Sequence, residues 1–171
     1  ILVMSFGTTF KETREKTIDA VMEEVRRAHP AAKVMLAFTS HIVVERVEKN
    51  ESVRYPTPEE ALQKLKEEGC TRVALVSLDI IPGIEYAYKR EVFDECKPWF
   101  QRMTLGTPLV YWQGQEEKRD DVAEVMAAVA KELPARAEDE AVLLMAHGTP
   151  HPANAYYAVM QERLENLGEE R

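Results

Sequence analysis

The stretch ILVMSFGTT, residues 1–9, is a run of strand-forming apolar residues that ends in a Gly-Thr-Thr turn. Along the rest of the chain, short apolar runs alternate with amphipathic stretches, which is the rhythm of a parallel α/β sheet. The expected fold is therefore an α/β domain with a parallel sheet. We expect its strands at residues 1–5, 33–38, 73–78, 108–112 and 141–146.

The helices between these strands have recognisable boundaries. From about Thr13, apolar residues recur at a spacing of 3.6 (Ile18, Val21, Met22, Val25), and this helix stops before Pro30. The sequence Thr57-Pro58-Glu59-Glu60 predicts a helix start with a capping box, and Gly69 predicts its end. Further helices are expected over residues 41–47, 86–100, 121–133 and 156–164.

The fifth expected strand repeats the first. With a shift of 141 residues, four of eight positions are identical: Leu2 with Leu143, Met4 with Met145, Gly7 with Gly148 and Thr8 with Thr149. This pattern indicates a duplicated α/β unit, with one domain at 1–138 and the first strand and helix of a second, truncated copy at 139–171. The alternative is a single sheet enlarged to five strands. The first interpretation predicts that this chain is part of a longer protein. Separately, the start at Ile1, without Met, indicates that the natural N-terminus is trimmed or lies before Ile1, so the lack of a leader is weak evidence about the compartment.

Composition excludes several classes of protein. The 171 residues carry 22 Lys and Arg against 30 Asp and Glu, so the net charge is −8, which argues against a nucleic-acid partner. No apolar run approaches the roughly 20 residues of a membrane span, so no membrane association is expected. Cys70 and Cys96 form no CxxC pair, and we interpret them as reduced thiols of a cytoplasmic protein.

Ligands of open α/β sheets bind beyond the carboxyl ends of the strands. That edge should gather residues 5–8, 39–40, 79–83, 113–114 and 147–151. Phe6 of the first repeat corresponds to His147 of the second, so one copy offers a flat apolar surface and the other a metal ligand or proton acceptor. A loop histidine held by hydrogen bonds is the alternative for His147. His151 is expected to serve the loop rather than a two-histidine chelate, because Gly148 and Pro150 prevent a helical pair.

Five segments of the chain together resemble the anaerobic sirohydrochlorin cobaltochelatases of cobalamin biosynthesis. This family of class II chelatases is related in fold to ferrochelatase, with two similar α/β halves that face a cleft. The resemblance runs across essentially the whole chain. It is carried by SFGTTFKETREKTI (5–18), AFTSHIV (37–43), TPEEALQKLKEEG (57–69), LDIIPGIEY (78–86) and MAHGTPHPANAYY (145–157).

The resemblance implies insertion of Co²⁺ into sirohydrochlorin, a reduced tetrapyrrole, without ATP. His147 matches the family's catalytic histidine, which is both metal ligand and proton acceptor. One imidazole suits Fe²⁺, Ni²⁺ or Zn²⁺ as well as Co²⁺. The expected walls for the flat ring are Ser5, Phe6, Gly7, Thr8, Ile81, Pro82 and Gly83, and the candidate cations for its carboxylates are Lys11, Arg14, Lys89 and Arg90.

The sequence departs from the family at the metal site, which also uses a glutamate and a second histidine from later in the second half. This sequence ends before either, so this chain alone is expected to be inactive unless a partner, a second copy or further residues complete the cleft. Pairing of two chains, as in the smallest chelatases, leaves a homo-oligomer open. Two alternatives of other classes remain: a non-catalytic tetrapyrrole or metal carrier with this fold, and an unrelated flavodoxin-like binding module.

Overall fold

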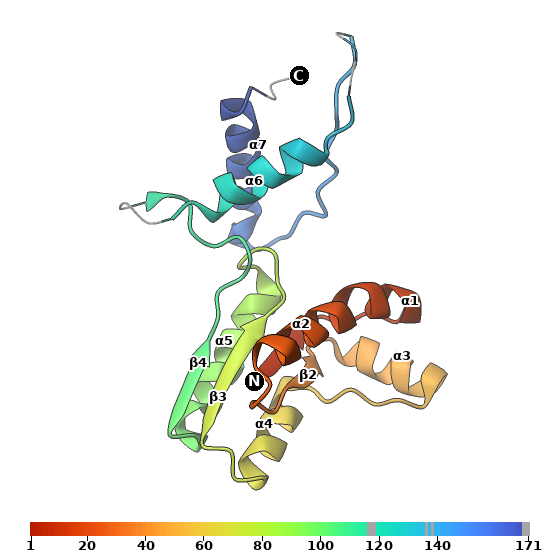
Figure 1. The fold of residues 1–171 in the computed structure, drawn as a ribbon, viewed down its shortest axis with the longest axis vertical. Helices are drawn as coiled ribbons and strands as arrows, with labels where there is room; N and C mark the ends of the chain where they lie inside the picture. The colour runs from red at the N-terminus through yellow and green to blue at the C-terminus, as the bar shows by residue number, and fades with distance from the viewer. Residues whose placement is uncertain (116–118, 136, 138, 169–171) are drawn as a thin grey trace. The chain divides into compact units, whose positions relative to one another are not determined.

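The structure is a computed structural model that describes residues 1–115, 119–135, 137 and 139–168 (Figure 1). The chain divides into two compact units. The first consists of Ile1–Asp79 and Glu85–Pro108, and the second of Ile80–Ile84 and Leu109–Arg171. The domain boundary predicted at residue 138 lies outside the described residues, as do residues 169–171 of the predicted second domain.

The first unit is built on a four-stranded, fully parallel sheet, which confirms the α/β class. Its strand order is β2-β1-β3-β4, so β1 lies in the middle and pairs with both β2 and β3. Leu2 is aligned with Met35 on one side and with Leu75 on the other. The strands are β1 (Leu2–Ser5), β2 (Met35–Phe38), β3 (Arg72–Ser77) and β4 (Arg102–Leu105).

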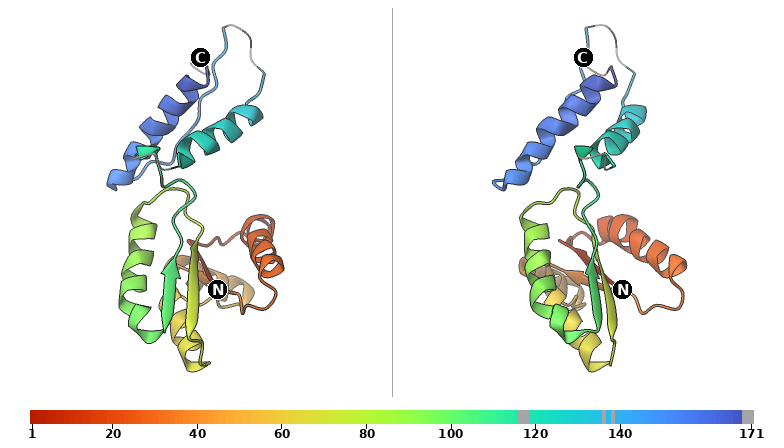
Figure 2. Two further views of the ribbon diagram at one scale, coloured as in Figure 1. Left: turned by 60° about the vertical axis from the view of Figure 1, so that its left-hand side comes forward. Right: turned by 90° about the vertical axis from the view of Figure 1, so that its left-hand side faces the viewer.

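Helices cover both faces of this sheet, which makes three layers (Figure 2). Successive side chains of a strand point to opposite faces. Leu2 and Met4 accordingly join one apolar cluster, and Val3 joins the other. The first cluster includes residues of α4 (Pro58–Glu67) and α5 (Ile84–Cys96), and the second includes residues of α2 (Ala20–Ala28) and α3 (His41–Glu51). The fully buried β1 therefore acts as the centre of the fold.

The helix boundaries expected from capping residues are confirmed. The hydroxyl of Thr57 accepts from the Glu60 N–H while the Glu60 carboxylate accepts from the Thr57 N–H, so the capping box at the start of α4 is complete. Gly69 has a φ of +77°, the left-handed conformation expected beyond a helix end. The 3₁₀ turn η2 (Lys97–Trp99) extends α5 toward the predicted end.

The first helix differs in detail from the prediction. It begins earlier, as α1 (Lys11–Arg14), and continues through the π-helical turn η1 (Glu15–Asp19) into α2. Ile18 and Met22 are buried as expected, but Val21 is exposed. A stripe at positions i, i+4 and i+7 covers the sheet, and Val21 lies at its edge.

The fourth strand was predicted at the wrong place. β4 ends at Leu105, and residues 108–112 form no strand. The backbone N–H groups of Tyr111 and Trp112 donate to the Asp121 carboxylate, at 3.0 and 2.9 Å. A buried side chain therefore satisfies the amides that a neighbouring strand would otherwise bind.

The second unit has a small core between two helices, α6 (Asp121–Glu132) and α7 (Tyr156–Asn166), and the 3₁₀ turn η4 (Pro152–Ala155) precedes α7. Both helices match the prediction. Their cluster contains Val110, Val122, Met126 and Leu164.

The fifth predicted strand is also wrong: residues 141–146 form no strand. Leu143 and Met145 are 90% and 93% exposed, although their counterparts Leu2 and Met4 are fully buried. A strand needs a paired neighbour for its backbone groups. All four strands of the described residues belong to the first unit, so this segment has no ladder to join.

Two smaller expectations can be compared with the structure. Cys70 and Cys96 are free thiols, as predicted. No helix within the described part of the chain is long and apolar enough to cross a membrane.

Candidate functional site

The loop after β1 lies at the carboxyl edge of the sheet, as predicted for Ser5, Phe6, Gly7 and Thr8. Gly7 has a φ of +93°, and a Cβ atom there would come within 2.7 Å of the Phe38 ring. Only glycine fits this approach, because an added side chain would clash and the backbone angle is unfavourable for L-residues. The loop is fixed further by the hydroxyl of Ser5, which accepts from the Gly7 N–H at 3.2 Å.

This loop meets the end of β2. Thr39 N–H donates to the Ser5 carbonyl at 2.8 Å, and Ser40 N–H donates to the Phe6 carbonyl at 3.3 Å. Phe6 is 49% exposed, so a ligand can contact it. Phe10 and Ile42, which follow the same two strands, are also exposed. Exposed apolar side chains at the edge where ligands bind are suited to a large flat molecule.

A buried polar network lies at the carboxyl end of β3. The Lys89 ammonium is 2.6 Å from Asp79 Oδ2, and the Ser77 hydroxyl donates to the same oxygen at 2.6 Å. Close by, Thr39 Oγ1 donates to Glu85 Oε2, also at 2.6 Å. Burial lowers the pKa of Lys89, while the carboxylates of Asp79 and Glu85 act in the opposite direction. The network fixes the start of α5 to the ends of β2 and β3.

This network overturns the expectation that Lys89 is free to meet substrate carboxylates. Its side chain is 0% exposed and is neutralised by Asp79. Arg14 is likewise buried and is paired with Glu51 at 2.5 Å. Lys11 and Arg90 remain exposed. The spacing of Glu85 and Lys89, four residues apart on one helix, was the only sequence signal for the network.

The remaining candidate residues belong to the second unit. Ile81 packs against the apolar cluster around Val110, and Pro82 and Gly83 are half-buried. Gly83 N–H donates to the Ile81 carbonyl at 2.8 Å, which closes a tight turn. The turn is held by local contacts on both sides of its proline.

His147 lies in the irregular segment before η4, and its ring is exposed. Its Nδ1 is 2.9 Å from the Gly148 carbonyl oxygen. A carbonyl only accepts, so Nδ1 carries the proton of the neutral ring and Nε2 keeps its lone pair. That lone pair can bind a metal ion or accept a proton.

His151 has a different role, as predicted. Its Nδ1 accepts from the Ala153 N–H at 3.1 Å and caps η4. Asn154 Oδ1 accepts from the Thr149 N–H at 3.1 Å and closes the loop. The loop thus uses one imidazole for its own structure and leaves the other, His147, open.

The sequence of the chain matches a known protein family. Residues 1–170 match the family model described as "Cobalt chelatase (CbiK)". The chain belongs to the cobalt chelatase family. This membership replaces the flavodoxin-like alternative.

Two curated relatives are similar in sequence to this chain over most of its length. It is 34% identical, over 164 residues, to a sirohydrochlorin cobaltochelatase of Salmonella typhimurium, with 96% of this chain and 60% of the relative covered. It is 36% identical, over 167 residues, to the sirohydrochlorin cobaltochelatase CbiKC of Nitratidesulfovibrio vulgaris, with 94% and 55% covered. The chain thus spans less than two thirds of either relative's length.

Side chains that can bind a metal do not cluster in the part of the chain that the structure describes. No group of three or more His, Cys, Asp and Glu side chains there could hold a metal ion. Catalytic metal sites usually have about three protein ligands. Within the described residues, His147 therefore belongs to no such group.

Proposed function

We propose that the protein inserts Co²⁺ into sirohydrochlorin without ATP, with His147 as metal ligand and proton acceptor. The observation that carries the proposal is the exposed His147 ring, whose Nδ1 is held by the Gly148 carbonyl so that Nε2 keeps a free lone pair. The cobalt chelatase family of the chain supports it. So do the two relatives, both named as sirohydrochlorin cobaltochelatases.

Metal insertion requires side chains that bind the metal ion and a group that accepts the pyrrole protons. The ring exchanges two pyrrole N–H protons for one Co²⁺, so charge is conserved and two protons reach solvent. A neutral imidazole binds borderline divalent ions, including Fe²⁺, Ni²⁺ and Zn²⁺. It also exchanges protons near neutral pH. Because the His147 ring is exposed, a proton taken from the pyrrole can pass on to water.

We infer that residues 5–8 of the first unit and residues 81–83 of the second each take part in binding the flat ring. The exposed ring of Phe6 supports the first wall, since an aromatic face stacks well on a conjugated macrocycle. One imidazole supplies one bond to the metal, so further ligands would come from outside the described residues or from a second copy in a homo-oligomer. The free thiols of Cys70 and Cys96 support action in the cytoplasm.

The test is an insertion assay on the full-length gene product with sirohydrochlorin and Co²⁺, followed by the change in absorption spectrum. His147→Ala should lower the rate at least about 100-fold, the usual contribution of a proton-transferring side chain. His151→Asn is the matched control. It changes a histidine four residues from His147 but keeps a capping acceptor for the Ala153 N–H, so it should insert metal at the wild-type rate.

Equal rates for wild type and His147→Ala would contradict the assignment of His147. A second candidate function is a non-catalytic carrier of tetrapyrrole or metal, favoured by the absence of a three-ligand cluster within the described residues. A carrier would bind sirohydrochlorin in a fixed ratio and release it without cobalt, whatever the metal concentration.

A further inference from the structure

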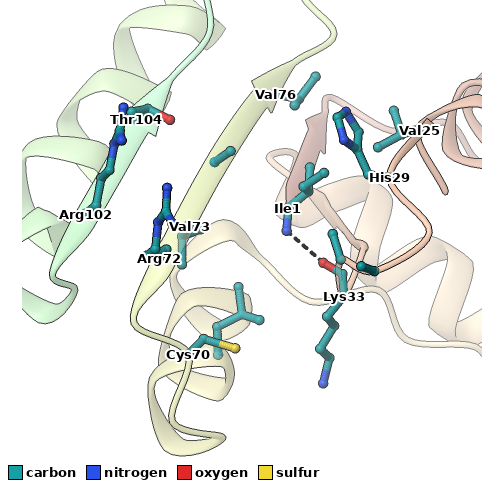
Figure 3. Close-up of a pocket in the computed structure, with 14 residues that line it drawn as sticks. Ile1, Val25, His29, Lys33, Cys70, Arg72, Val73, Val76, Arg102 and Thr104 are labelled. Carbon is teal, nitrogen blue, oxygen red and sulfur yellow. Dashed lines mark hydrogen bonds between the residues drawn. The ribbon is translucent and has the colours of Figure 1, made fainter.

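A pocket of about 760 Å³ lies at the amino-terminal ends of the strands in the first unit (Figure 3). Arg72 and Arg102, the first residues of β3 and β4, line one side of it. Lys33 and His29, from the segment between α2 and β2, line the opposite side. The pocket is within the size range of small-molecule sites. It is separate from the carboxyl edge of the same sheet, where Ser5–Thr8 are placed.

The charge of this pocket is opposite to that of the chain. The net charge of the protein is −8, yet the residues that line the pocket include Lys33, Arg72 and Arg102 and neither Asp nor Glu. Lys33 is paired with Glu68 on the surface. Among the residues that the structure describes, no side chain or carbonyl is an ion-pair or hydrogen-bond partner of the Arg72 or Arg102 guanidinium, although the Arg102 backbone N–H donates to the Thr71 carbonyl. Their positive charges are therefore uncompensated.

The two arginines are also placed side by side. Arg72 is the direct partner of Arg102 in the register of β3 and β4, and both side chains are exposed. Like charges on directly paired positions of a sheet repel each other and are destabilising. A bound anion removes this repulsion, and planar guanidinium groups bind carboxylates and phosphates with two parallel hydrogen bonds.

The floor between the charged groups is apolar. Ala74 and Val76 follow Arg72 at alternate positions of β3 and share its face of the sheet, and Val25 contributes from α2. Small side chains on this floor leave room for a flat body. The ligand that matches floor and rim has an apolar body with acidic groups at its margin.

We propose that this pocket binds an organic anion with an apolar body and two acidic groups, held by Arg72 and Arg102. The proposal is independent of the cobaltochelatase assignment, because it uses none of the residues placed in that site. The ligand class is defined by two features, charge and apolar surface, and each can be removed separately.

The test uses naphthalene-2,6-dicarboxylate as the probe with the full-length gene product, measured by calorimetry. One molecule should bind per chain. The uncharged dimethyl ester, which keeps the apolar body, and inorganic pyrophosphate, which keeps only charge, should each bind at least about tenfold more weakly. Higher salt should weaken the dicarboxylate, because the contacts are ionic and close to solvent.

Arg72→Gln and Arg102→Gln should each weaken the dicarboxylate about tenfold. Arg46→Gln, on the exposed side of α3 and outside the pocket, should bind like wild type. Melting temperatures of all three variants show that the fold is kept. The proposal is overturned if the dicarboxylate does not saturate, if the arginine variants bind it like wild type, or if the ester or pyrophosphate binds equally well.

Discussion

Replacement of Lys89 by methionine tests the energetics of the buried network at the carboxyl end of β3. Methionine has nearly the length and volume of lysine but no charge, so packing against β3 is largely kept. The substitution removes the ammonium that lies 2.6 Å from Asp79 Oδ2. Asp79 is 12% exposed, so its carboxylate is then left mostly out of water without a counter-charge.

Breaking a buried ion pair by removal of one partner costs about 3–5 kcal/mol. The lower end applies here, because the Ser77 hydroxyl continues to donate to Asp79 and water can reach the carboxylate. We therefore expect a loss of about 3 kcal/mol, which lowers the melting temperature of a protein of this size by about 10 °C. Denaturant and thermal unfolding of the two proteins at pH 7 measure both quantities.

The double variant Lys89→Met with Asp79→Asn is the control for this reasoning. Asparagine keeps an acceptor for Ser77 and removes the unpaired charge, so most of the lost stability should return. The reasoning is refuted if the single variant unfolds within about 1 kcal/mol of wild type, or if the double variant is as unstable as the single one.

The same side chain predicts a pH dependence. Burial lowers the pKa of Lys89 in the folded state, so the unfolded chain binds more protons at pH values between the lowered pKa and 10.5. Stability conferred through this group must therefore rise with pH in that window. The difference in unfolding free energy between wild type and Lys89→Met should grow as pH rises toward 10.5, and a constant difference would contradict the assignment.

The remaining predictions concern two glycines and the cap of α4. Gly7→Ala should destabilise by about 3 kcal/mol, from the left-handed φ and the 2.7 Å approach to Phe38. Gly69→Ala, with a similar φ but no atom within 4 Å, should lose only about 1 kcal/mol in the same unfolding experiment. Thr57→Ala should cost about 1 kcal/mol through loss of the cap on α4. The pKa of the Glu60 carboxyl is held below its usual value, mainly by the hydrogen bond from the Thr57 N–H and secondly by the Arg54 guanidinium. The stability that the charged Glu60 provides should therefore be lost as pH falls through that lowered pKa. Glu60→Gln should remove this pH dependence.

Local signals in the sequence were sufficient for most elements of the first unit. Alternation of buried faces along residues 2–5, the Thr57–Glu60 box and the left-handed Gly69 each depend on contacts within a few residues or on a single central strand. The loop at residues 5–8 was placed correctly for the same reason, because it follows a strand whose burial was evident. Sequence patterns are reliable where the deciding contact is close along the chain.

The burial of Lys89 could not be predicted in this way. Its partner Asp79 lies in the loop after β3, ten residues earlier, and a lysine on an amphipathic helix is ordinarily solvated. The tautomer of His147 was also beyond the sequence, since it depends on the position of the Gly148 carbonyl. The first feature determines whether Lys89 can bind a ligand, and the second determines which nitrogen of His147 can bind a metal. Both depend on where the neighbouring groups lie in the fold and not on the residue type.

The repeated octapeptide shows why strand prediction failed in one place and succeeded in another. Residues 1–8 and 142–149 share four identities, yet the first copy forms a central strand and the second none. Apolar residues at the right spacing provide only one condition for a strand. The other condition is a pair of neighbours for its N–H and C=O groups, which β2 and β3 provide for Leu2–Ser5. Leu143 and Met145 have the residue types of a buried strand but are exposed, because no neighbouring strand among the described residues pairs with their segment. With a paired strand on each side, the segment would match the first copy.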